Sequence, residues 1–165
     1  MTKIVVIGGG ASGLMSAIQA ARKGASVTIL EHNDKVGKKI LATGNGRCNL
    51  TNLHQQPSCY RCSDAKYPWK IITQFSEKDT PHFFLDLGIE TKERNGWIYP
   101  YSDQASSICE VLEMEARYLK AKIKTNEEVI GIKKLEQGYQ VLTKGWHYDC
   151  DKVIISCGSH ASSVE

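Results

Sequence analysis

The sequence lacks a strong charge of either sign, a low-complexity tract and an apolar run long enough to span a membrane. Its 21 lysines and arginines and 18 acidic residues give a net charge of +3, and the lysines are scattered. Nucleic acid is therefore not expected as a partner. Residues 4–21 resemble the apolar part of a signal peptide, but their glycines, serines and Gln19 argue against one. We expect a cytoplasmic protein that does not bind a membrane.

Six cysteines are many for 165 residues, but they do not form the framework of a secreted domain. Cys109 and Cys157 stand among apolar residues and are predicted to be buried thiols. Cys59 and Cys62 form a C-x-x-C pair, which suits half a zinc site or a redox pair. No second pair has standard zinc spacing, and the pair lies in a polar stretch rather than between a strand and a helix. We therefore favour a coincidence in a surface loop and predict no metal site.

The chain begins with an apolar strand, a glycine-rich turn, a helix of small residues and a second strand that ends on an acid. The predicted elements are strand 3–8, helix 12–23 and strand 26–31, with Gly24 as the helix stop. This order is typical of a dinucleotide-binding unit. The N–H groups at the helix start, from Ala11 and Ser12 onward, are expected to point at phosphates with the helix dipole behind them.

The three glycines of the G-x-G-x-x-G pattern have separate predicted roles. Gly8 permits a tight turn, Gly10 lets a pyrophosphate approach the backbone, and Gly13 lets the helix lie close to the sheet. Glu31 follows Gly8 by 23 residues, where a carboxylate can accept both hydroxyls of an adenosine ribose. Because its charge would repel a 2′-phosphate, FAD or NAD is favoured over NADP at this site.

The rest of the chain has a weaker pattern. Residues 32–68 show no clear periodicity, and a stretch this long is usually functional or disordered. The other predicted elements are a short helix at 71–75, a helix that is capped by Ser76 and runs through Phe83, Phe84 and Leu87 to Gly88, a strand at 97–99, a helix capped by Asp103, an antiparallel meander from Lys122 to Tyr148, and a buried strand at 152–157. The last strand is expected to rejoin the first parallel sheet. Since such sheets continue with further βα units, we expect the chain to be cut short.

The richest local motif is residues 37–52, GKKILATGNGRCNLTN. Its cations are Lys38, Lys39 and Arg47, and its amides are Asn45, Asn49 and Asn52. Gly44 and Gly46 can free backbone N–H groups for an anion-binding nest, and the amides suit the edge of a flavin. The composition alone is equally consistent with an Asn/Gly-rich turn whose lysines are solvated.

This block, placed after the glycine turn and Glu31, resembles the signature of the BaiN/RdsA-type NAD(P)/FAD-dependent oxidoreductases. That family includes bile-acid-inducible N-type reductases and aminoacetone oxidase-like flavoproteins. Residues 95–106, NGWIYPYSDQAS, are similar to the family's G-R-x-[FY]-P-x-S-D-x-A-S block. Residues 153–158 occupy the place of its second flavin-binding strand, although Ser156 and Cys157 depart from its usual Ala-Thr-Gly-Gly.

The resemblance implies an α/β, Rossmann-like FAD-binding domain of the glutathione-reductase type with an antiparallel β-meander. Residues 1–165 would be the N-terminal part of this FAD/NAD(P)-binding domain, without the substrate domain and the C-terminal segment that completes the flavin site. The implied cofactor is FAD, with NAD(P)H as electron donor for a small organic or steroid-like substrate. The implied cofactor-binding residues are Gly8, Gly10, Ala11, Ser12, Gly13, Glu31, Lys39, Thr43, Gly44, Asn45, Gly46, Arg47, Cys48, Asn49, Val129 and Gly158.

Two other functions stay open. The N-terminal fingerprint also fits half of an NAD-binding dehydrogenase, although the meander favours FAD because simple NAD domains continue with βα units. A truncated fragment without catalytic activity is the third hypothesis. No residue is assigned as a general acid or base; Tyr99, Tyr101 and His54 are only polar candidates, and packing at a strand end is favoured for the two tyrosines.

Overall fold

The computed structural model describes residues 1–64 and 66–158, and the chain forms two compact units. The first unit contains Met1–Ile40 and the chain from Cys109 onward, and the second contains Leu41–Ile108. The two boundaries between the units fall within helices: after Ile40 in α2 (Lys38–Ala42) and after Ile108 in α5 (Ala105–Tyr118). Within the described ranges, no helix is long and apolar enough to cross a membrane. That residues 1–165 form one cofactor-binding domain stays a prediction.

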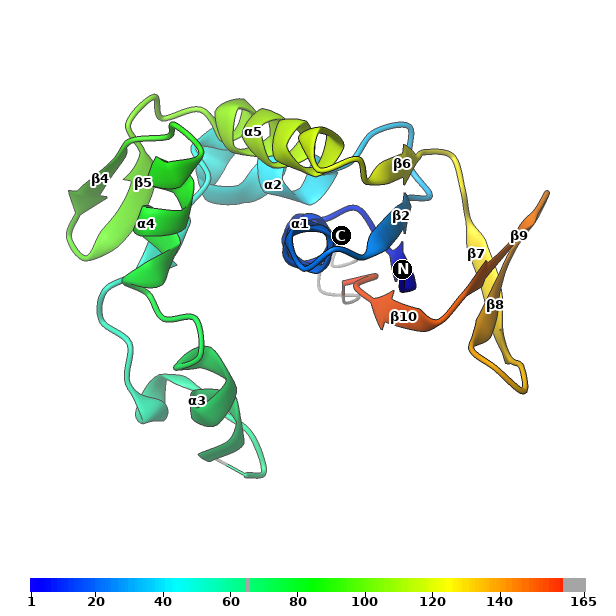
Figure 1. The fold of residues 1–165 in the computed structure, drawn as a ribbon. Helices are drawn as coiled ribbons and strands as arrows, with labels where there is room; N and C mark the ends of the chain where they lie inside the picture. The colour runs from blue at the N-terminus through cyan, green and yellow to red at the C-terminus, as the bar shows by residue number, and fades with distance from the viewer. Residues whose placement is uncertain (65, 159–165) are drawn as a thin grey trace, which may run out of the picture. The chain divides into compact units, whose positions relative to one another are not determined.

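A four-stranded parallel sheet forms the centre of the first unit (Figure 1). Its strands are β1 (Lys3–Ile7), β2 (Ser26–Leu30), β6 (Lys122–Lys124) and β10 (Lys152–Ile155), in the order β10-β1-β2-β6. Val5 of β1 lies opposite Thr28 of β2 and Val153 of β10. The α/β, Rossmann-like fold predicted from the sequence is confirmed, including the return of the last strand to this sheet.

The helix α1 (Ala11–Arg22) covers one face of the sheet with its small residues. Gly13, Leu14, Ala17 and Ile18 are its buried residues, and their spacing places them along one side of the helix. Gly24, with φ +82°, follows the last turn, as the predicted helix stop requires. The first strand buries Val5, Val6 and Ile7 in succession, as a parallel strand covered on both faces does.

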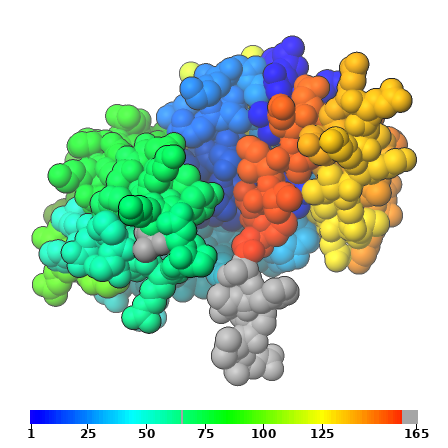
Figure 2. All heavy atoms as spheres, turned by 90° about the horizontal axis from the view of Figure 1, so that it is seen from below, coloured from blue at the N-terminus to red at the C-terminus, as the bar shows by residue number. Residues whose placement is uncertain are grey.

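An antiparallel meander packs on the sheet of the first unit. Its strands are β7 (Val129–Lys134), β8 (Tyr139–Thr143) and β9 (His147–Cys150). Val141 and Cys150 of the meander form a buried cluster with Val5, Ile7 and Leu30 of the sheet. Figure 2 shows the meander, in yellow and orange, beside the orange-red β10. This part of the prediction is confirmed.

The second unit contains a small antiparallel sheet and short helices. The sheet has the order β3-β5-β4, with β3 (Thr51–Asn52), β4 (Thr91–Arg94) and β5 (Trp97–Pro100). The helices are α3 (Lys66–Ile72) and α4 (Asp79–Asp86), with single 3₁₀ turns η1 (Thr43–Gly46) and η2 (Pro57–Cys59). Phe83 and Phe84 of α4 are buried and meet edge to face, with ring centroids 5.3 Å apart.

Several predicted elements are placed differently. Lys122–Lys124 is an edge strand of the parallel sheet rather than part of the meander, because the chain that leaves α5 pairs with β2. The helix expected at 71–75 is α3, which begins at Lys66 because Pro68 is tolerated in a first turn. The strand β4 was not predicted, since Thr91–Arg94 contains no apolar residue.

Two side-chain predictions are wrong. The Asp103 carboxylate does not cap α5; its Oδ2 accepts hydrogen bonds from Lys92 and Arg94, and its Oδ1 has no partner among the described residues. The Ser102 hydroxyl instead accepts a bond from the Gln104 N–H. Cys109 is buried as predicted, but Cys157 is exposed because it follows the end of β10.

Candidate functional site

The glycine turn of the first unit is closed at two glycines by neighbouring backbone. Gly8 has φ +101°, and a Cβ there would lie 2.4 Å from the Ser156 carbonyl oxygen. A Cβ on Gly13 would lie 1.9 Å from the Gly8 carbonyl oxygen. Neither position has room for a side chain. The roles predicted for these two glycines, a tight turn and a close approach of the helix, therefore agree with the structure.

Gly10 differs from both, because a Cβ there would meet no atom within 4 Å. Gly10 is also the N-cap of α1 and offers no side-chain cap. The first bond of the helix runs from the Leu14 N–H to the Gly10 carbonyl at 2.9 Å, so the N–H groups of Ala11, Ser12 and Gly13 precede it. Ala11 and Ser12 are exposed. This helix start has the geometry of an anion-binding turn.

The sequence motif does not reveal the role of Gly9. A Cβ at Gly9 would lie 2.5 Å from Val36 Cγ1 and 3.2 Å from Glu31 Oε2. Its N–H donates to Glu31 Oε2 at 2.7 Å, and its carbonyl accepts from the Gly37 N–H at 2.9 Å. The run of three consecutive glycines is the signal for this position. Gly9 connects the turn to the acid at the end of β2.

Glu31 is only 6% exposed and holds its charge through hydrogen bonds. Burial by itself raises the pKa of the carboxyl, but bonds from the Asn33 and Gly9 N–H groups and the Asn33 amide, with nearby His32, hold it below its ordinary value. Oε1 accepts from the Asn33 N–H at 2.9 Å and lies 3.0 Å from His32 Nδ1. Gly9 is the one donor to Oε2 among the described residues, so this oxygen has the capacity to accept a further hydrogen bond.

The chain before the meander lies beside this acid. The Glu127 N–H donates to the Glu31 carbonyl at 2.9 Å, and the Asn126 N–H donates to the Asn33 carbonyl at 2.8 Å. Val129 follows as the first residue of β7. The predicted contact between the Val129 backbone and an adenine stays a prediction, although the structure brings its segment to the end of β2.

The end of β10 packs against the glycine turn. The Ser156 N–H donates to the Ile7 carbonyl at 2.8 Å, and Cys157 Sγ lies 3.8 Å from the same oxygen. Gly158 has φ +78°, and a Cβ on it would meet no atom within 4 Å. Ser156 therefore fits the tight turn at Gly8, while Gly158 extends beyond it. Lys39, the other predicted residue of this unit, is exposed on α2.

The predicted residues of the second unit form a loop with a left-handed backbone. Gly44, Asn45 and Gly46 have φ values of +55°, +54° and +81°. All residues from Thr43 to Arg47 are exposed. The Arg47 and Cys48 N–H groups donate within the loop, to the Gly44 and Thr43 carbonyls, both at 3.2 Å. The loop therefore presents residues 43–47 on its outer side.

Cys48 and Asn49 turn inward within this unit. Cys48 is buried, and its burial raises the pKa of the thiol. Asn49 Nδ2 donates to the Thr51 carbonyl at 3.2 Å and to the Ile98 carbonyl at 3.3 Å, so this amide joins the loop to the sheet. Contact of these two side chains with a cofactor stays a prediction, and the structure gives both a role in folding.

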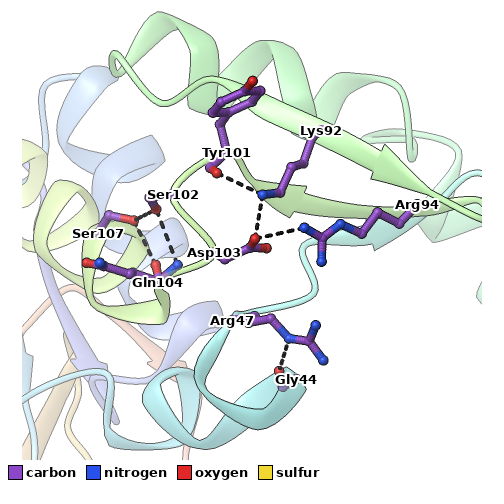
Figure 3. A network of polar contacts seen from close by, with 9 residues as sticks. All are labelled: Gly44, Arg47, Lys92, Arg94, Tyr101, Ser102, Asp103, Gln104 and Ser107. Carbon is purple, nitrogen blue, oxygen red and sulfur yellow. Dashed lines mark hydrogen bonds and ion pairs between the residues drawn. The ribbon is translucent and has the colours of Figure 1, made fainter.

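A network of charged side chains lies in the same unit (Figure 3). Asp103 Oδ2 accepts from Lys92 Nζ and, at 2.9 Å, from Arg94 Nη2, while Lys92 Nζ also donates to the Tyr101 carbonyl at 2.9 Å. The Arg47 guanidinium lies 5.8 Å from the ring centroid of Tyr99. Lys92 and Arg94 were not predicted, although their Lys-x-Arg spacing is the signal of two cations on one face of a strand.

The remaining candidates do not form a catalytic constellation. Tyr99 is half-buried and has Arg47 near its ring, while Tyr101 and His54 are exposed. Cys59 and Cys62 are exposed thiols. Across residues 1–64 and 66–158, no group of three or more His, Cys, Asp or Glu side chains could hold a metal ion.

The chain is similar to two curated bacterial enzymes. It is 48% identical over 164 residues to 3-dehydro-bile acid delta(4,6)-reductase of Clostridium scindens, covering 98% of this chain and 40% of the reductase. It is 29% identical over 158 residues to ribosomal RNA dihydrouridine synthase of Escherichia coli, covering 93% of this chain and 38% of the synthase. The chain therefore spans about two fifths of the length of these relatives.

The fold is shared with solved flavoprotein structures. The structure of CtdE in complex with FAD and a substrate superimposes with a TM-score of 0.59 at 17% identity, covering 99% of this chain and 39% of CtdE. This likeness concerns the fold alone. Residues 2–164 match the HI0933-like protein Rossmann domain, which confirms the family resemblance drawn from the glycine turn and residues 37–52. The chain belongs to the HI0933-like family and carries its Rossmann domain.

Proposed function

We propose that the chain is the FAD-binding portion of a flavoprotein oxidoreductase and that its first unit holds the ADP half of FAD. The observation that carries this proposal is the glycine turn, closed by backbone at Gly8 and Gly13 and open at Gly10. An acceptor position on the buried Glu31 accompanies it. These features suit a pyrophosphate at the start of α1 and a ribose hydroxyl at Glu31.

The residues fit FAD by their donors and acceptors. The N–H groups of Ala11 and Ser12 would donate to the phosphates, and Glu31 Oε2 would accept from the ribose. The exposed loop residues Thr43–Arg47 are proposed to contact the flavin or its pyrophosphate, a role supported by their glycines and cation. When bound, FAD supplies a ring that accepts and gives hydride, and the protein supplies position and electrostatics.

For the whole protein we propose NAD(P)H-dependent reduction of a small organic or steroid-like substrate in the cytoplasm. The support is 48% identity to a reductase named for a bile acid, together with the family match. Because the net charge of +3 is small and the lysines are scattered, nucleic acid is not proposed as a partner, and neither is a membrane. Because the chain spans 40% of that reductase, we expect the 165 residues alone to bind FAD weakly and to oxidise no NAD(P)H.

An NAD-binding half is the competing function. The variant Gly10→Val tests whether a dinucleotide of either kind binds at the glycine turn. A Cβ here meets no atom within 4 Å, so we expect the valine to leave the fold intact and to block the approach of the pyrophosphate. We expect FAD affinity, measured by quenching of flavin fluorescence, to fall about tenfold or more because charge-assisted bonds of about 1.5–3 kcal/mol are lost.

Gly145→Val is the matched control. Gly145 lies in the turn between β8 and β9, and a Cβ there also meets no atom within 4 Å. This variant should bind FAD as the wild type does. Wild-type affinity in Gly10→Val would contradict the proposed site. Binding of NAD but not FAD by the wild type would favour the dehydrogenase half instead.

A further inference from the structure

The sheet of the second unit carries cations and aromatic rings on one face. Lys92 and Arg94 are two residues apart on β4 and therefore project to the same side. Their direct partners on β5 are Tyr99 and Trp97, which share that side because opposite residues of an antiparallel pair do. Trp97 is 47% exposed and the Arg94 side chain 48%.

These cations converge around a single acid, as Figure 3 shows. Asp103 forms ion pairs with Lys92 and Arg94, and Arg47 lies nearby over the ring of Tyr99. In the described part of the chain, Asp103 is the only acid that forms an ion pair with Lys92 or Arg94, and no acid lies within ion-pair distance of Arg47. Three positive charges and one negative charge leave an excess of about two on this face, which favours an anion.

Asp103 holds the two β4 cations side by side at a conformational cost. Its backbone has φ +56°, in the left-handed region that L residues rarely adopt, and its buried Oδ1 has no partner in residues 1–64 and 66–158. The hydrogen bond from Lys92 and the charge of Arg94 hold the pKa of the carboxyl below its ordinary value, so the acid stays ionised. A strained residue of this kind persists where the surrounding structure holds it in place. Here the Asp103 carboxylate holds two like charges close together.

This inference rests on the proposed function, in which NAD(P)H gives electrons to FAD. A protein of that function binds two dinucleotides, FAD and NAD(P)H. The chain has one G-x-G-x-x-G turn, at Gly8–Gly13, and the proposed function uses it for FAD. With that turn assigned to FAD, the phosphates of the donor bind elsewhere in the protein. Cations that can form bidentate bonds suit phosphates, and an exposed indole suits the stacking of a planar base.

We propose that the face formed by Lys92, Arg94 and Trp97 binds the electron donor NAD(P)H, with its pyrophosphate on the two cations and a base on the indole. Arg47 adds to the positive field of this face. Asp103 is a positioning residue that holds Lys92 and Arg94 close to one another through its Oδ2.

The test is direct binding of NADPH to the full chain with the variant Arg94→Gln. Fluorescence titration with NADPH should show an affinity about tenfold lower than in the wild type, as expected for loss of a charge-assisted bond. FAD affinity, titrated separately, should stay unchanged. Lys70→Gln on α3 is the control, because it removes the same charge from an exposed lysine elsewhere in the second unit and should not alter either affinity.

Trp97→Ala is a second variant that leaves every ion pair in place. It should weaken NADPH binding several-fold by removing the stacking surface. Equal NADPH affinity in the wild type, Arg94→Gln and Trp97→Ala would overturn this inference, as would a wild type that binds no NADPH. A loss of FAD affinity in Arg94→Gln with unchanged NADPH affinity would assign the cations to FAD instead. Failure of the wild type to bind FAD would overturn the proposed function, whatever the NADPH result.

Discussion

The two glycine-rich segments of this chain use glycine for different physical reasons. At Gly8 and Gly13 of the first unit, glycine is needed because backbone lies where a Cβ would be: the Ser156 carbonyl for Gly8 and the Gly8 carbonyl for Gly13. In the loop Thr43–Asn49 of the second unit, Gly46 has open space around it and is needed for its φ of +81°. The first requirement is one of packing against backbone, and the second is one of backbone conformation.

This difference predicts unequal effects on stability, and the largest belongs to Gly13→Ala. A Cβ 1.9 Å from the Gly8 carbonyl oxygen forces backbone to move, so we expect a loss of about 3 kcal/mol in the free energy of unfolding. Gly46→Ala should lose about 1–2 kcal/mol, the cost of a left-handed alanine. Urea unfolding followed by circular dichroism measures both.

Gly10→Ala is the control for this pair, because its Cβ meets nothing and its φ is −78°. Its free energy of unfolding should stay within about 0.5 kcal/mol of the wild type. Equal losses in Gly13→Ala and Gly46→Ala would remove the distinction between a packing requirement and a conformational one.

Glu31→Ala sharpens the comparison at the acid beside the glycine turn. It should weaken FAD binding by about 1–3 kcal/mol, the range for hydrogen bonds to a charged acceptor. Isothermal titration of the wild type and the variant with FAD measures this. His32→Ala is a suitable control, since His32 is exposed and contacts the same carboxylate from outside. An unchanged affinity in Glu31→Ala would mean that another residue holds the ribose.

The same carboxylate should make stability depend on pH. Its folded pKa lies below the unfolded value, so its stabilising contribution is fully present above the ordinary glutamate pKa of about 4.3. The contribution is lost as the pH falls through the lower folded value. Unfolding curves between neutral pH and this range should therefore show a steeper fall in the wild type than in Glu31→Gln.

The sequence predicted those parts of the fold whose pattern is local. The run Lys3–Ile7, the small residues of α1 and Gly24 each carry their own signal, and the first unit follows it. Thr91–Arg94 carries none, because four polar residues form a strand only when Trp97–Pro100 pairs with them. Lys122–Lys124 was assigned to the wrong sheet for a related reason: three residues contain too little alternation to specify a partner.

The candidate site residues also fall into those that a local pattern predicts and those that depend on strand pairing. Gly10 and Glu31 are found by motif spacing, since both stand at fixed distances from a strand end. Asp103 was predicted as a helix cap because its place before a helix suggested one, whereas its partners Lys92 and Arg94 reach it only through the pairing of β4 with β5. Asn49 was predicted to meet a flavin; its bond to Ile98 reaches the predicted strand at 97–99, but its bond to Thr51 reaches β3, which the sequence did not indicate.

The smallest expected effect is a change in hydrogen exchange on adding FAD, which should differ between the outer residues of the loop Thr43–Asn49 and its inner residues. The Cys48 N–H is already bonded to the Thr43 carbonyl, as the Gly8 N–H is to the Leu30 carbonyl, so hydrogen exchange at both should be slow with or without FAD. If the loop contacts FAD, exchange at Gly44–Gly46 should slow by about fivefold, the effect of a hydrogen bond worth about 1 kcal/mol. Exchange measured by mass spectrometry on overlapping peptides resolves these groups. Equal rates in both states would make residues 43–47 a solvated turn, and the left-handed backbone would then serve only to bring Asn49 to the sheet.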